Sequence, residues 1–163
     1  RAGRTCTGKL SAVHLGHRYE TDVLSLDIQV HGHMAGEASW KSTIYAILEA
    51  ASETLQIARD DIGGTIRPTG PTSRSLVLFD TVPGGGGNVL HIADRLNDVL
   101  IAALRRVTTC ECGPETSCYG CLRGYRNQRD HELLSRGAAA DFLVSLGVDR
   151  GRSQGGAEAG VLT

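Results

Sequence analysis

The sequence contains no long apolar run and very little lysine. No apolar stretch in its 163 residues approaches the ~18 needed to span a bilayer, and no segment combines the basic, apolar and small-residue zones of a signal peptide. These absences predict a soluble, cytoplasmic protein. Of the 17 basic residues only Lys9 and Lys41 are lysine, so chemistry that requires a titratable amine has few candidates.

A strongly basic charge balance is also missing. The formal net charge is −1 and the pI is about 6.6, whereas a dedicated nucleic-acid-binding domain commonly has a pI above about 9. The charge is nevertheless uneven along the chain. Residues 19–61 hold eight acidic and two basic residues, and residues 105–136 hold six arginines and four acidic residues. We therefore expect one acidic end and one mildly basic end.

Two segments have the pattern of β-strands. Residues 24–30 alternate apolar and polar side chains, as expected for a strand with one buried face, and residues 13–17 repeat this pattern more weakly. A hairpin turning near residues 18–21 is therefore predicted. Residues 76–79 form a continuous apolar run, which is typical of a buried central strand. A further short strand is predicted at residues 65–67.

Three segments have the periodicity of amphipathic helices, with apolar side chains recurring every three or four positions. We expect Gly63 and Gly64 to terminate the first helix and Asn88 to be the N-cap of the second. The predicted helices cover residues 39–58, 88–107 and 128–146.

These elements predict a single domain of the α/β (α+β) class. Its small mixed or antiparallel sheet is expected to pack with about three helices over residues 10–147, a length that fits one domain of roughly 100 to 150 residues. The N-terminal segment 1–9 is expected to be poorly ordered. The tail 148–163 has too little apolar content to pack and is expected to be disordered.

Four of the five cysteines lie within twelve residues, in the spacing C-x-C-x5-C-x-x-C. Such a tight cluster suits one small ion, and C-x-C and C-x-x-C elements each supply two sulfurs to tetrahedral zinc. Disulfides, free thiols and an iron–sulfur cluster are the alternatives, and His131 is an alternative to one cysteine. We predict a closed, structural Zn²⁺ site in a zinc knuckle at residues 108–128, between the last two helices. The predicted ligands are Cys110, Cys112, Cys118 and Cys121.

A glycine loop joins the predicted central strand to the second helix. It has three interpretations: a tight turn, a contact for a phosphate or nucleic-acid backbone at a helix N-terminus, or a site with a catalytic carboxylate. It is not a Walker A loop, because no Lys-Ser/Thr follows the glycines. The loop residues considered are Asp80, Gly84, Gly85, Gly86 and Gly87.

The segment 122–131 reads LRGYRNQRDH and is rich in arginine. Arginine contacts phosphates and aromatic rings stack on bases, so this composition favours binding of a nucleic-acid backbone or single strand. The alternative is that these side chains fasten the knuckle to the acidic half of the domain and offset the negative charge of the thiolates. The candidate nucleic-acid-binding residues are Arg123, Tyr125, Arg126, Asn127 and Arg129.

Taken in order, these motifs resemble the MrfA-type zinc-binding domain, over most of residues 14–146. This family is a C-terminal domain of unknown function of Mrf-type DNA helicases, and it also occurs in the DrmB protein of the DISARM anti-phage system. The resemblance carries the four clustered cysteines over as zinc ligands. The matching motifs lie at residues 16–24, 45–51, 80–85, 110–112, 117–128 and 131–136.

The resemblance implies a non-catalytic structural-zinc accessory domain of a larger ATP-dependent DNA helicase or of a helicase partner, acting in DNA repair or anti-phage defence. The expected partners are DNA and helicase motor domains in cis or a helicase subunit in trans, with no membrane partner. The alternatives are a nuclease or hydrolase using Asp80 and His91, and a protein–protein docking module. Because the chain begins at Arg1 and its only methionine is Met34, we expect a piece of a longer polypeptide.

Overall fold

The computed structural model describes most of the chain. The segments predicted to be poorly ordered, 1–9 and 148–163, lie largely outside the described residues. The described residues are 8–9, 11–14, 16–29, 35–70 and 73–149.

The sheet has three strands, β1 (Val23–Gln29), β2 (Ile62–Pro68) and β3 (Ser73–Asp80). Their order is β1-β3-β2, and both neighbouring pairs are antiparallel. The central strand β3 is the predicted buried strand, and its side chains Leu76 and Leu78 are fully buried. The predicted fold class, a small antiparallel sheet packed with helices, is therefore confirmed.

The predicted hairpin between residues 13–17 and 24–30 is wrong. The partner of β1 is β3, with Val23 opposite Phe79, and the described residues between 11 and 22 contain no strand. The alternation in 13–17 includes few apolar side chains, so pairing there buries little surface, whereas β3 offers a whole apolar face. The chain just before β1 is instead held by Thr21, whose hydroxyl donates to the carbonyl of Asp80 at 2.8 Å.

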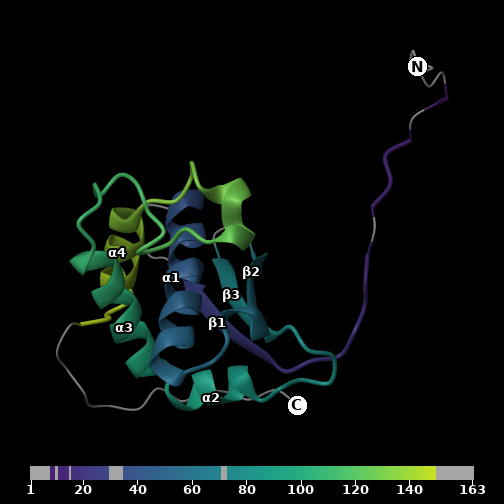
Figure 1. Cartoon of the computed structure of the whole chain (residues 1–163), viewed down its shortest axis with the longest axis horizontal. Helices are drawn as coiled ribbons and strands as arrows, with labels where there is room; N and C mark the ends of the chain where they lie inside the picture. The colour runs from purple at the N-terminus through teal and green to yellow at the C-terminus, as the bar shows by residue number, and fades with distance from the viewer. Residues whose placement is uncertain (1–7, 10, 15, 30–34, 71–72, 150–163) are drawn as a thin grey trace, which may run out of the picture.

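The first helix, α1 (Glu37–Leu55), runs through the centre of the domain. It lies between the sheet on one side and the later helices on the other (Figure 1). Both sides of α1 are therefore covered, which explains why Ile44, Ala46 and Ala50, on different sides of the helix, are all buried. The helix ends at Gln56, which adopts a left-handed conformation with φ of 55°.

Gly63 and Gly64 lie in β2, so the prediction that they terminate the first helix is wrong. A β-carbon on Gly63 would lie 2.5 Å from the ring of Phe79, which is its cross-strand partner. A β-carbon on Gly64 would lie 2.8 Å from Cδ1 of Ile44 in α1. The two glycines therefore allow β2 to approach an aromatic ring on one face and a helix on the other.

The predicted helix 88–107 is divided into α2 (Asn88–Asp94) and α3 (Leu96–Thr109). The backbone departs from helical geometry at Arg95, with φ of −116° and ψ of 24°. The break has a packing reason, since α2 contacts β1 and β3 whereas α3 packs against α1 and α4. The N-cap of α2 is Gly87 and not Asn88 as predicted.

The predicted helix 128–146 is also divided. The 3₁₀ helix η2 (Tyr125–Asp130) comes first, and α4 (Arg136–Ser145) begins at a Ser135 N-cap whose hydroxyl accepts the N–H of Ala138. Another 3₁₀ helix, η1 (Arg59–Asp61), precedes β2. Among the described residues, no helix is long and apolar enough to cross a membrane.

Replacing Gly64 by valine tests the close contact between β2 and α1. We expect Gly64→Val to lower the free energy of unfolding by about 1–3 kcal/mol, because the added atoms overfill the space beside Ile44. Chemical denaturation followed by circular dichroism measures the change. Gly16→Val is the matched control, since a β-carbon there meets nothing within 4 Å. Equal stability of the two variants would contradict the packing described here.

Candidate metal centre

The four clustered cysteines directly follow α3 and bring their sulfur atoms together. All four Sγ atoms lie within 4.8 Å of one another. The Sγ of Cys110 is 3.5 Å from those of Cys112 and Cys118, and the Sγ of Cys121 is 3.8 Å from the same two atoms. The prediction that these residues form one cluster is confirmed.

The sulfur–sulfur distances distinguish among the metal and disulfide interpretations. A tetrahedral ion with Zn–S bonds of about 2.3 Å places its sulfurs about 3.8 Å apart. A disulfide requires about 2.05 Å, far less than the shortest separation of 3.5 Å. A four-iron cluster binds each thiolate to a different iron atom, which sets the thiolates farther apart than these contacts. The donor set therefore fits a single tetrahedral ion.

A tight turn at Cys118 positions the second pair of ligands. The carbonyl of Cys118 accepts the N–H groups of Cys121, Leu122 and Arg123 at 3.0–3.1 Å. In return, the N–H of Cys118 donates to the Sγ of Cys121 at 3.2 Å. Such an N–H···S bond stabilises a thiolate and fixes its orientation, so the backbone prepares Cys121 for a cation.

The thiols of the cluster differ in acidity. The pKa of Cys110 is lowered to about 7, mainly because its thiol makes a hydrogen bond with the backbone of Cys112. Burial raises the pKa of Cys121 to about 12, because a lone thiolate is poorly solvated there. A bound cation supplies the missing charge compensation, which is why metal binding at such a site releases protons.

Two arginines fasten the knuckle to the surrounding helices. Arg106 in α3 donates from Nε to the carbonyl of Cys121 at 2.7 Å, and Arg136 in α4 donates from Nε to the carbonyl of Cys112 at 2.5 Å. Arg106 also pairs with Glu53 of α1 at 2.5 Å. Sequence reasoning did not identify these two residues individually. The only signal for them was the arginine excess over residues 105–136.

Two residues of the arginine segment are used inside the knuckle. Asn127 is only 4% exposed, accepts the N–H of Gly124 at 2.7 Å and donates to the carbonyl of Leu122 at 2.8 Å. Arg123 donates to the hydroxyl of Ser117 at 3.1 Å. The prediction of a nucleic-acid contact is therefore corrected for Asn127, whose polar atoms are buried and paired. For Arg123, the geometry matches the alternative of an internal fastening.

The other predicted residues of the segment, Tyr125, Arg126 and Arg129, are exposed. Their backbone is anchored to α1 by Asp130, which accepts the hydroxyl of Tyr45 at 2.6 Å and pairs with Lys41 at 3.3 Å. Burial and this hydrogen bond raise the pKa of Tyr45. The 3₁₀ helix η2 is thus fixed in position against α1.

His131 does not join the cysteine cluster. Its Nε2 lies 2.9 Å from Oδ1 of Asn127 and 3.1 Å from the carbonyl of Gly124. Its ring stacks edge-on with Tyr119 at a centroid distance of 5.5 Å. Among the described residues, the metal-ligand group consists of cysteines alone, so the alternative of a histidine ligand is not supported.

The glycine loop is organised by a buried carboxylate. Asp80 is 0% exposed and accepts the N–H groups of Gly86 at 2.6 Å, Asn88 at 3.1 Å and Val89 at 3.0 Å. Asp22 accepts the N–H of Gly87 at 3.1 Å. The N–H groups that an external phosphate would use are therefore paired with the protein's own acids.

This arrangement favours the tight-turn interpretation of the glycine loop. Gly84, Gly85 and Gly87 have positive φ angles of 88°, 79° and 74°, a conformation in which glycine is favoured. Asp80 is buried and bound by three backbone groups, whereas His91 is exposed on α2. The geometry thus assigns Asp80 to the support of the turn and gives the nuclease alternative no accessible carboxylate at this position.

Fold and site together define a small α+β domain with a cluster of four cysteines that could hold a metal ion. Residues 43–122, which include all four clustered cysteines, match the MrfA Zn-binding domain. The resemblance drawn from the motifs is therefore confirmed over these residues, which are similar to the MrfA Zn-binding domain.

Two longer proteins are similar to this chain. The Druantia protein DruE of Escherichia coli (strain UMEA 4076-1) is 34% identical over 86% of the chain, which spans 8% of DruE. A crystal structure of the DUF1998 helicase MrfA bound to DNA superposes with a TM-score of 0.57 at 18% identity, over 76% of this chain and 17% of that one. At that identity, the second comparison supports the shared fold alone.

Removing the carboxylate of Asp80 tests its role in the turn. We expect Asp80→Ala to lower the free energy of unfolding by about 2–4 kcal/mol, because three N–H groups lose a charged acceptor. Urea denaturation measures the loss. Asp94→Ala, an exposed acid at the other end of α2, serves as control and should change stability little. A destabilisation no larger than that of the control would refute the assignment.

Removing the side chain of Arg136 tests the fastening of the knuckle. We expect Arg136→Ala to weaken metal affinity about 10- to 100-fold, because the carbonyl of Cys112 loses the donor that orients this ligand. Competition against a chromophoric zinc chelator measures the affinity. The exposed Arg105 provides a control with the same loss of charge, Arg105→Ala. If both variants bind metal equally well, the contact does not orient the ligand.

Proposed function

We propose that this chain is a non-catalytic accessory domain with a structural zinc ion, belonging to a larger ATP-dependent DNA helicase or to a helicase partner. One observation carries this proposal: four thiolates at tetrahedral spacing lie within the segment that matches the MrfA Zn-binding domain. The chain aligns with only 8% of the Druantia protein DruE and 17% of the helicase MrfA, which supports a place within a longer protein.

The ligand set supports a structural and not a catalytic metal. A catalytic zinc ion keeps one coordination position for water or substrate, whereas four cysteines fill all four positions. Each of Cys112 and Cys121 is also held through its carbonyl by an arginine from a neighbouring helix. In the proposal, zinc holds together the segment between α3 and η2, and ATP hydrolysis belongs to motor domains outside this chain.

DNA is the proposed partner of the exposed face of η2. Tyr125, Arg126 and Arg129 lie on this one short helix, where an aromatic ring and two guanidinium groups are available to bases and phosphates. The work of the parent protein is proposed to lie in DNA repair or anti-phage defence, as the family resemblance implies. We also propose that it takes place in the cytoplasm.

Metal removal tests the structural role. We expect a zinc chelator to lower the melting temperature by about 10 °C or more, because the metal's binding energy contributes directly to folding. Cys118→Ser should have the same effect, whereas Cys6→Ser, about a hundred residues away in the sequence, should not. Circular dichroism measures the melting curve and a colorimetric assay the zinc content, expected at one ion per chain. An unchanged melting curve after complete metal removal would contradict the structural role of the metal.

A further inference from the structure

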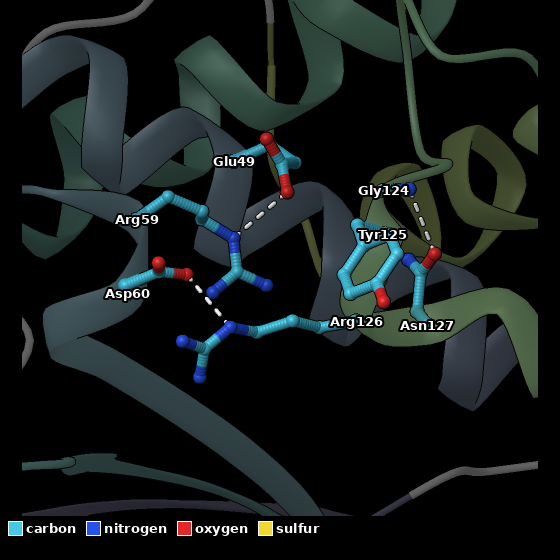
Figure 2. A pocket seen from close by; sticks show the side chains of 7 residues that line it. All are labelled: Glu49, Arg59, Asp60, Gly124, Tyr125, Arg126 and Asn127. Atoms are coloured by element: carbon cyan, nitrogen blue, oxygen red, sulfur yellow. Dashed lines mark hydrogen bonds and ion pairs between the residues drawn. The ribbon is translucent and has the colours of Figure 1, made fainter.

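A cleft of about 500 Å³ lies beside the arginine segment, between α1, η1 and η2 (Figure 2). It is distinct from the metal centre, since no cysteine lines it. Figure 2 shows two guanidinium groups and a tyrosine ring facing this cleft. The lining residues are Glu49, Arg59, Asp60, Gly124, Tyr125, Arg126 and Asn127.

One of the two arginines is rigidly held. Arg59 donates from Nε to Glu49 at 2.8 Å and from Nη1 to the carbonyl of Ile62 at 3.0 Å. Among the described residues, its Nη2 makes no hydrogen bond. Arg59 therefore presents one available donor from a fixed position in the cleft, a preorganised half of an anion site.

The other arginine is held loosely. The Nε of Arg126 lies 2.7 Å from Oδ1 of Asp60, and these side chains are 64% and 68% exposed. Ion pairs this exposed contribute little to stability, so another anion can take the place of Asp60 at small cost. Within the described part of the chain, the two Nη atoms of Arg126 have no other partner. Asp60 thus occupies the position that an incoming phosphate would take.

Tyr125 completes the cleft with an aromatic surface. Its side chain is 85% exposed, although its backbone is fixed by the buried Asn127 and by Asp130 of η2, which accepts the hydroxyl of Tyr45 in α1. A rigidly mounted ring that packs against little of its own domain is suited to stack on a flat ligand. The ring and the two guanidinium groups line the same space, so one ligand can contact all of them.

We propose that this cleft binds one nucleotide of single-stranded DNA. The phosphate displaces Asp60 from Arg126 and is shared with Arg59, while the base stacks on Tyr125. This inference rests on the proposed function, in which the domain belongs to a protein that acts on DNA. No covalent step is involved, and Asp60 acts as a competitor that tunes the affinity.

The chemistry of the cleft favours a nucleotide over an acidic peptide. A peptide carboxylate would only exchange one carboxylate for another on Arg126 and would leave Tyr125 uncovered. A phosphodiester has the geometry for donors from two guanidinium groups, and its attached base provides the flat surface. The charges of Glu49 and Asp60 balance those of the two arginines, so the cleft attracts a polyanion only weakly by charge. Tight binding therefore also needs a base that stacks on Tyr125.

Fluorescence anisotropy of a labelled dT12 oligonucleotide with the zinc-loaded 163-residue chain tests the proposal. We expect Tyr125→Ala to weaken binding about 5- to 100-fold, and Tyr125→Phe to retain it, because stacking needs only the ring. Arg126→Ala should weaken binding and reduce the salt slope by about 1. Asp60→Asn should strengthen binding about two- to fivefold, because the competing carboxylate is gone.

Arg95 and Asp98 provide a matched control pair. They form an ion pair of similar exposure, at 2.6 Å, at the junction of α2 and α3, which lies at the opposite end of the domain from η2 (Figure 1). Arg95→Ala and Asp98→Asn repeat the same charge changes away from the cleft and should leave the affinity near that of the parent chain. The melting temperature of every variant verifies that it is folded.

Four results would overturn the proposal. The first is an Asp60→Asn effect no larger than that of Asp98→Asn, and the second is equal binding of a twelve-residue glutamate peptide. The third is absence of dT12 binding by the parent chain. None of these affects the zinc dependence of the melting curve, so loss of the cleft proposal is distinguishable from loss of the proposed structural role. Free dTMP forms an additional arm, and binding as tight as that of dT12 would contradict recognition of a strand.

Discussion

The mutual proximity of four sulfur atoms is the constraint on which the C-terminal half of the domain depends. Four thiolates within 4.8 Å of one another would repel, so the deprotonated cluster suits a bound cation that compensates their charge. Once the sulfurs are held, the carbonyls of Cys112 and Cys121 are fixed acceptors for Arg136 and Arg106. Those contacts join the cysteine segment to α3 and to α4.

The glycine loop, at the opposite end of the domain, is stabilised in a different way. There a buried carboxylate, Asp80, binds the N–H groups of the glycine loop and the first turn of α2. The anion is part of the chain, so this end needs no external ligand. An abundance of glycine beside a helix N-terminus suggested a site for a phosphate, but the protein's own acid fills that position. The domain thus has a cysteine cluster that could hold an ion at one end and a glycine loop bound by its own carboxylate at the other.

Local features were predictable from the sequence, and long-range partners were not. Cysteine spacing identified the cluster because its ligands are close in sequence, and apolar periodicity located α1 because burial follows the helical repeat. The partner of β1 depends on β3, some fifty residues away, which alternation within 13–17 does not reveal. Gly63 and Gly64 resembled a helix stop, but their role depends on Phe79 and Ile44. Arg106 and Arg136 gained significance only when the fold brought backbone carbonyls to them.

The twelve-residue span of the cysteine cluster has a consequence for how the domain assembles. The entropy cost of closing a loop rises with its length, so joining Cys110 to Cys121 costs less than pairing Val23 with Phe79. Short-range closure is also faster than long-range strand pairing. A chain with an unpaired or misregistered sheet can therefore already hold its metal ion. Metal stoichiometry alone consequently does not measure the fraction of molecules that have reached the native state.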